Sequence, residues 1–167
     1  MSRSRHILLP LLLPLLSTSM LEAQPPATSP APTVFHLSEA TIDEVHAAIR
    51  SGRSTCRALI DLYLKRVAAY NKSGPGLNAV QAINPRALEE ADRLDAAFKA
   101  SGPVGALHCI PVLVKDQLDT TDIPTTYGSA VFKDFVPQKD ATVVTKLRKA
   151  GAVIIAKATM GEFASGI

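Results

Sequence analysis

Two short apolar runs in the second half of the chain constrain its fold more than any other feature. They span residues 110–114 (IPVLV) and 152–156 (AVIIA). A strand without polar alternation is typical of a sheet that is covered on both faces. The segment between the runs contains a helical pattern, which Asp140 can cap and Gly151 can end. Because a strand, a helical crossover and a second strand build parallel sheets, the sequence predicts an α/β fold with a mixed, largely parallel sheet covered by helices.

Three helical patterns precede these runs. Thr41 can cap the first, with Glu44 at the capping-box distance. The second covers about 55–67, and the third covers about 84–100, with Asn84 as its cap and a proline in its first turn. Residues 79–83, between the second and third patterns, predict a strand. The fold is therefore expected to begin with helices and to continue into the sheet.

The first residues of the chain have a composition of their own. Two arginines precede an apolar run over 7–16, and small and polar residues follow. A basic start, a short apolar stretch and a small-residue exit are typical of a secretory signal peptide. The run is too short for a bilayer span, which requires ~20 residues. The sequence predicts a signal peptide over 1–24, a Pro-rich spacer over 25–36, a folded part over 37–167, and a secreted or extracytoplasmic location. An uncleaved anchor or a chance apolar start is the alternative.

Charge and cysteine content exclude some classes of protein. The net charge is +3, and no block of like charges forms the basic patch of a nucleic-acid-binding protein. Cys56 and Cys109 are the two cysteines, and one pair does not make a disulfide framework. The pattern favours two buried free thiols. A single bridge, in an oxidising compartment, is the alternative.

Charged and small polar residues follow each apolar run. Lys115 and Asp116 follow the first run, and 157–159 (KAT) follow the second. In open α/β sheets, functional side chains collect just beyond the carboxyl ends of the strands. Lys115 is therefore a candidate functional residue. The plain alternative is that it marks the point where a buried strand meets water.

The segment 105–116 (GALHCIPVLVKD) closely resembles the lysine-bearing segment of the amidase signature family, G-x-L-x-G-I-P-[IV]-x-[VI]-K-D. Cys109 stands where the family usually has Gly, and Gly161 stands where many members have Ser. The resemblance covers roughly residues 37–167. Its further elements lie at 77–79 (LNA), 125–129 (TTYGS), 147–152 (LRKAGA) and 157–164 (KATMGEFA).

This resemblance implies a hydrolase that cleaves carboxamide C–N bonds with a Ser–cis-Ser–Lys triad. Lys115 would be its base, and Gly128 and Ser129 would line the substrate pocket, although a plain turn explains these two equally well. Both triad serines of the family lie in a Gly/Ser-rich segment, and none occurs before Ile167. The chain therefore looks like the N-terminal portion of an amidase, inactive alone. The expected partner is a small-molecule amide, with no metal or cofactor; nothing indicates the oligomeric state.

The proposed base must meet a physical requirement. A lysine accepts a proton only when neutral, so its pKa must lie well below the ordinary value of ~10.4. Burial lowers a lysine pKa, and the apolar run before Lys115 predicts such burial. Asp116 is expected to point to the opposite face, toward a cap or loop. His108 has no partner at metal-ligand spacing and is expected to be structural, while His36 and His46 are expected to be exposed.

Two other functions remain open. The family also contains the amidotransferase subunit that releases ammonia from glutamine for tRNA-linked chemistry with partner proteins. The export-like N-terminus argues against this function. A non-catalytic remnant of an amidase is the third possibility. The coding sequence beyond Ile167 distinguishes them, because an in-frame Gly/Ser-rich segment would supply the serines.

Overall fold

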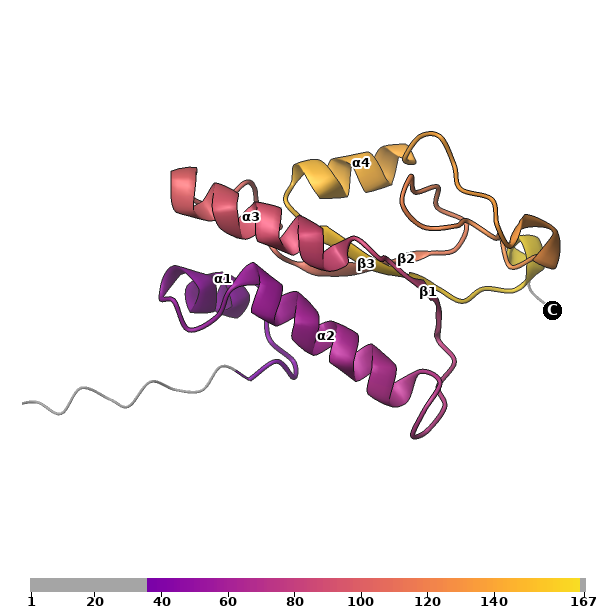
Figure 1. Ribbon diagram of the computed structural model, residues 1–167, viewed down its shortest axis with the longest axis horizontal. Helices are drawn as coiled ribbons and strands as arrows, with labels where there is room; N and C mark the ends of the chain where they lie inside the picture. The colour runs from indigo at the N-terminus through magenta and orange to yellow at the C-terminus, as the bar shows by residue number, and fades with distance from the viewer. Residues whose placement is uncertain (1–35, 166–167) are drawn as a thin grey trace, which may run out of the picture. The chain divides into compact units, whose positions relative to one another are not determined.

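The structure is a computed structural model that describes residues 36–165 (Figure 1). The signal peptide expected over 1–24 lies outside these residues, as does the spacer over 25–36 apart from His36, so both stay predictions. Among the helices of the described part, none is long and apolar enough to cross a bilayer. The regular elements are α1 (Ile42–Arg50), α2 (Cys56–Tyr70), β1 (Val80–Ile83), α3 (Ala87–Ser101), β2 (Pro111–Lys115), α4 (Thr142–Lys149) and β3 (Val153–Ala158).

The strands form one sheet in the order β1-β3-β2. The central strand, β3, is parallel to β2 and antiparallel to β1. The two apolar runs of the sequence are thus neighbouring parallel strands, and the connection between them contains α4. The predicted α/β class with a mixed sheet is confirmed, and the strand predicted over 79–83 pairs on the other side of β3.

Helices cover both faces of this sheet. One face packs against α1, α2 and α3, and α4 lies on the other side of the strands from α1 and α2 (Figure 1). The buried residues of the cluster beneath α4 are Val114, Ile123, Val144 and Ile154. The larger cluster, beneath the other helices, includes Val45, Leu59, Ile60, Leu94, Val153 and Ile155.

The first two helices begin as the sequence predicts. The hydroxyl of Thr41 accepts a hydrogen bond from the backbone N–H of Glu44 at 3.2 Å, and the Glu44 carboxylate accepts the Thr41 N–H at 2.8 Å. This is the predicted capping box. The α2 helix has Thr55 as its cap. In addition, the Asp95 carboxylate of α3 accepts the N–H groups of Cys56 and Arg57 at 2.7 and 3.0 Å. A carboxylate from a neighbouring helix thus satisfies two of the N–H groups that a helix start leaves unpaired.

The two other predicted caps have different outcomes. The α3 helix begins later than predicted, after Arg86, but the Asn84 side-chain oxygen does accept the Arg86 N–H at 2.8 Å, while the Asn84 amide donates to the Ile154 carbonyl at 2.7 Å. Asn84 therefore ties the helix start to β3. Asp140 does not cap α4, which begins after Ala141 without a side-chain cap. The Asp140 carboxylate instead accepts the Thr121 N–H at 2.8 Å. The predicted Asp140 cap is therefore wrong because a tertiary contact takes its side chain, whereas Asn84 makes a local capping bond and a tertiary bond together.

An irregularity in β3 decides which way its last residues point. Val112 pairs with Ile154, but Leu113 pairs with Ala156, so Ile155 is an extra residue in the β2–β3 register. Alternation along a strand has a period of two residues, and one extra residue reverses the phase. Ile155 and Ala156 consequently both belong to the cluster beneath α1–α3. Lys157 then lies on the same face as Ile154, toward the loops before α4.

Cys56 and Cys109 form a disulfide, so the expectation of two free thiols is wrong. Both residues are completely buried. The bridge joins the first residue of α2 to the segment just before β2. Cys109 has a φ of +64°, in the left-handed region that favours glycine. The family's usual glycine suits that backbone, and the cysteine adopts it while bonded to α2.

Candidate active site

Lys115 is the last residue of β2, at the carboxyl end of the strand. Its side chain is exposed in the described part of the chain, so the predicted burial is wrong there. The Nζ atom donates a hydrogen bond to the Thr159 carbonyl, just beyond the end of β3. The backbone carbonyl of Lys115 accepts the Leu118 N–H at 2.9 Å, which closes a tight turn. The amine is thus accessible and lies beside the ends of both parallel strands.

Asp116 turns away from this amine, as the strand geometry predicts. Its carboxylate is buried and accepts hydrogen bonds from the Thr126 N–H, at 3.1 Å, and from the Thr126 hydroxyl. Its backbone N–H donates to the Ala158 carbonyl at 3.1 Å. Asp116 therefore connects the end of β2 to the loop that contains Thr126.

The buried lysine of this region is Lys157, which is fully inaccessible to solvent. Its Nζ atom donates to the Leu118 carbonyl at 2.6 Å and to the Thr125 hydroxyl at 2.7 Å. It also lies 4.0 Å from a carboxylate oxygen of Asp116. Burial lowers the pKa of the Lys157 amine, and the negative charge of Asp116 opposes this effect. Sequence reasoning placed Lys157 at a strand end but missed its role, because the extra residue in β3 is not visible in the apolar pattern.

Gly128 and Ser129 form a turn that packs against the segment after β3. Gly128 has a φ of +74°, and a Cβ atom there would lie 2.6 Å from the Gly161 carbonyl oxygen. The close approach requires glycine. Ser129 is buried, and its hydroxyl donates to the Glu162 carboxylate at 2.7 Å. The turn borders an open hollow of about 320 Å³, whose lining residues are Gln81, Thr126, Gly128, Ser129, Ala130, Lys133 and Met160.

His108 has the contacts of a packed side chain. It is buried, and its ring stacks on that of Phe98 with centroids 5.5 Å apart. Its Nδ1 atom accepts the Val104 N–H at 3.3 Å. His46, which was expected to be exposed, is half-buried, with Nε2 2.9 Å from the His108 carbonyl oxygen. Within residues 36–165, no three His, Cys, Asp or Glu side chains form a group that could hold a metal ion.

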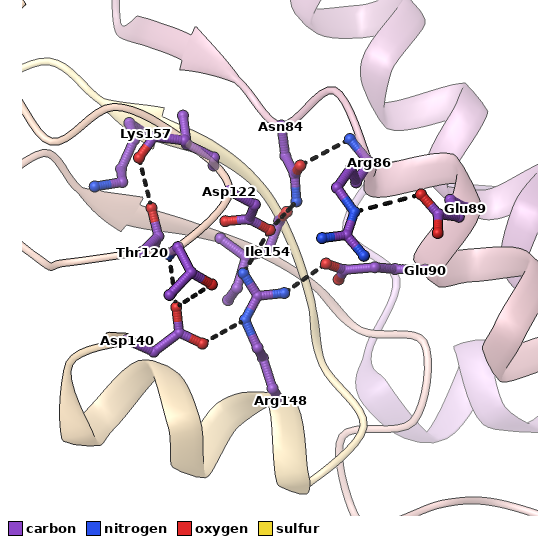
Figure 2. A network of polar contacts seen from close by, with 12 residues as sticks. Asn84, Arg86, Glu89, Glu90, Thr120, Asp122, Asp140, Arg148, Ile154 and Lys157 are labelled. Atoms are coloured by element: carbon purple, nitrogen blue, oxygen red, sulfur yellow. Dashed lines mark hydrogen bonds and ion pairs between the residues drawn. The ribbon is translucent and has the colours of Figure 1, made fainter. Parts of the chain in front are cut away.

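A charged network fixes the loop between β2 and α4 (Figure 2). Arg148 of α4 contacts three carboxylates, Glu90 at 2.5 Å, Asp122 at 2.6 Å and Asp140 at 3.0 Å. Asn84 adds a hydrogen bond to Asp122 at 2.9 Å. Burial raises the pKa of the Glu90 carboxyl, although the Arg148 charge opposes this. The network joins α3, α4 and the loop, so it holds the segment that follows Lys115 against the helices.

Comparisons with known proteins agree on one family. Residues 58–167 match the family model Amidase. The chain is 41% identical over 132 residues to a glutamyl-tRNA(Gln) amidotransferase subunit of Maridesulfovibrio salexigens, with 78% of the chain and 26% of the relative covered. It is 38% identical over 135 residues to a probable amidase of Arabidopsis thaliana, covering 79% of the chain and 26% of that protein.

A solved structure agrees. The native peptide amidase of Stenotrophomonas maltophilia matches with a TM-score of 0.74 and 36% identity, over 77% of this chain and 26% of that one. The chain therefore spans about a quarter of the length of these relatives.

Proposed function

The chain belongs to the amidase signature family, and on this premise we propose that it is part of a hydrolase that cleaves small-molecule carboxamides by a Ser–cis-Ser–Lys mechanism. The observation that carries the proposal is the position of Lys115. This lysine stands at the carboxyl end of a parallel strand, with an accessible amine and a fixed backbone. That edge of an α/β sheet is where catalytic side chains collect.

In this mechanism Lys115 is the base. Its neutral amine accepts the proton of a bridging serine, which in turn accepts the proton of the nucleophilic serine as that oxygen attacks the carbonyl carbon. Both serines would come from a part of the polypeptide beyond Ile167. The exposed apolar side chain of Leu113 on β2, 44% accessible, is consistent with further structure covering this strand.

The Cys56–Cys109 bridge supports the proposed location outside the cytoplasm. Structural disulfides form and persist in oxidising compartments and are rare in the cytosol. The bridge is fully buried, as a structural disulfide is expected to be. The predicted export signal and the bridge are independent features, and both favour an extracytoplasmic amidase.

The alternative is an amidotransferase subunit, which the 41% identity to the Maridesulfovibrio salexigens protein favours. That protein's name makes it one subunit of an amidotransferase and ties it to glutamyl-tRNA(Gln). The buried disulfide and the export-like N-terminus favour the free-standing amidase over this alternative. A non-catalytic remnant is the remaining candidate, and one assay separates it from the enzyme.

The test uses the longest in-frame polypeptide that contains these residues, assayed with a simple aryl amide. Lys115→Arg should lower kcat by several powers of ten, since guanidinium stays protonated and cannot act as a base. Lys65→Arg is the matched control, because Lys65 is an exposed lysine of α2 that pairs only with Asp61 among the described contacts. Near-normal turnover by Lys115→Arg would overturn the mechanism. If the parent polypeptide lacks a Gly/Ser-rich segment and shows no turnover, the protein is a non-catalytic remnant of an amidase.

A further inference from the structure

Lys157 is unusual because an ammonium-bearing side chain occupies the interior of the protein. It is the largest of the fully buried side chains in the described residues, and the four residues before it in β3 are buried and apolar. Moving an amine out of water costs free energy unless other polar groups replace the water. A lysine at such a position is therefore expected to make specific contacts.

Within the described residues, the polar contacts of the Lys157 amine all lie in the segment that follows Lys115. They are the Leu118 carbonyl, the Thr125 hydroxyl and, at 4.0 Å, the Asp116 carboxylate. Three polar groups of one loop thus take the place of water around an amine that comes from β3. The extra residue in β3 points the amine to this face of the sheet.

The backbone of Leu118 links the two lysines. Leu118 donates its N–H to the Lys115 carbonyl at 2.9 Å, and its own carbonyl accepts the Lys157 amine at 2.6 Å. The first bond closes the turn from Lys115 to Leu118, and the second anchors its Leu118 end to β3. Asp116, inside the turn, binds Thr126 and faces Lys157. Any movement of the Lys157 amine changes the support of the turn that begins at Lys115.

We propose that Lys157 is a positioning residue for Lys115: it fixes the 115–118 turn through the Leu118 carbonyl and so sets the direction of the Lys115 amine. This inference rests on the proposed function for its consequence in catalysis. Lys157 itself does not contact the Lys115 side chain, which bonds Thr159 on the other side of the strand ends. Its effect passes through the backbone.

The first test separates positioning from simple charge balance. Lys157→Met should lower kcat on the aryl amide by about 10–100-fold with little change in KM, because small misplacements of a catalytic group cost that much. The same variant leaves Asp116 buried without a counter-charge, so it should also unfold more easily. The double variant Asp116→Asn/Lys157→Met removes both charges. It should regain thermal stability but not kcat.

Recovery of kcat together with stability in the double variant would overturn the proposal, because Lys157 would then only neutralise Asp116. If Lys157→Met alone does not fold, the double variant carries the test. Lys149→Met is the matched control, since Lys149 is an exposed lysine at the end of α4. It should match the parent in kcat and in stability.

The second test does not depend on amidase activity. The parent and the variants are treated with limiting acetic anhydride, and peptide mass spectrometry gives the acetylation of Lys115 relative to that of exposed Lys65. Lys157→Met and the double variant should change this ratio by about threefold to tenfold, the scale of one lost hydrogen bond at the Lys115 amine. Lys149→Met should leave the ratio unchanged.

The two tests fail differently. A changed ratio in a protein that hydrolyses no amide would keep the positioning inference and remove the proposed function. An unchanged ratio in Lys157→Met and in the double variant, with kcat equal to that of the parent, would overturn the inference and leave the proposed function intact.

Discussion

On the face of the sheet that α1, α2 and α3 cover, thirteen buried residues of the described chain form one apolar cluster, and a disulfide crosses it. On the face that α4 covers, the apolar cluster has four buried members in the described chain, and most of the specific contacts are polar. There Arg148 contacts three carboxylates, and Lys157 bonds two loop residues. We call these the helical face and the α4 face.

The difference separates two ways of stabilising a fold. Apolar contacts on the helical face are many, so the loss of one leaves the others in place. A polar network depends on each member, because removing one partner leaves a buried charge unpaired. The α4 face holds the loop that follows Lys115. Its few specific contacts therefore fix the backbone near the candidate base more narrowly than apolar packing could.

The largest expected effect is on the α4 face. Arg148→Met should lower the free energy of unfolding by about 3–5 kcal/mol, because Glu90, Asp122 and Asp140 lose their shared cation. Urea denaturation of the protein measures this loss. Hydrogen exchange should become faster in α4 and in the 116–125 loop while α2 keeps its protection.

Arg93→Met is the control for this substitution, since Arg93 is an exposed residue of α3. If the Arg148→Met protein were as stable as the Arg93→Met protein, the contrast between a polar α4 face and an apolar helical face would be wrong. The α4 face would then depend on its small apolar cluster and not on the network.

How well the sequence predicts each face follows the same division. The helical face depends on local signals, and Thr41, Thr55 and the apolar stripes gave its helices correctly. The mixed α/β class followed from the two apolar runs. Lys115 was placed correctly at the end of its strand, but its catalytic role stays a prediction. Each of these features is set by residues that are close together in the sequence, so the sequence alone can predict it.

The α4 face was predicted less well because its contacts are long-range. Asp140 was assigned to a cap but bonds Thr121 and Arg148 instead, and Asn84 bonds the distant Ile154 carbonyl in addition to the Arg86 N–H. Lys157 was missed because one extra residue in β3 reverses the alternation of its side chains. The disulfide is the exception on the helical face, where the same cause applies: Cys56 and Cys109 meet only when α2 packs beside the segment before β2. Tertiary geometry, not local propensity, decides these positions.

The next largest effect tests the helical face. Replacing both cysteines, as in Cys56→Ala/Cys109→Ala, should lower the free energy of unfolding by about 2–4 kcal/mol, since the unfolded chain loses a cross-link. The start of α2 should lose protection from hydrogen exchange, and α4 should not. This is the reverse of the pattern expected for Arg148→Met. Loss of protection on both faces in both variants would show that the two faces do not open separately.

A matched variant separates the bridge from the backbone beneath it. Cys56→Ala/Cys109→Gly also lacks the bridge, but glycine suits the φ of +64° at position 109. It should be about 1 kcal/mol more stable than the double alanine variant in the same urea titration. Equal stability of the two would mean that the backbone at position 109 relaxes once the bridge is gone.

The smallest expected effect is a dependence on pH that comes from His108, on the helical face beside Cys109. Burial lowers the pKa of the His108 ring below its ordinary value of 6.5, the charge of His46 adds to this, and Asp95 opposes it. The unfolded chain then binds the proton more readily than the folded one. The stability that His108 contributes is therefore fully present above pH 6.5 and is lost as the pH falls below it.

His108→Phe preserves a ring beside Phe98 but cannot titrate, so its Tm should fall less than that of the parent between about pH 7 and pH 5. His36→Phe, at an exposed histidine, should follow the parent. Parallel Tm curves for His108→Phe and the parent would place the acid sensitivity elsewhere, and the carboxylates around Arg148 on the α4 face would be the next group to test.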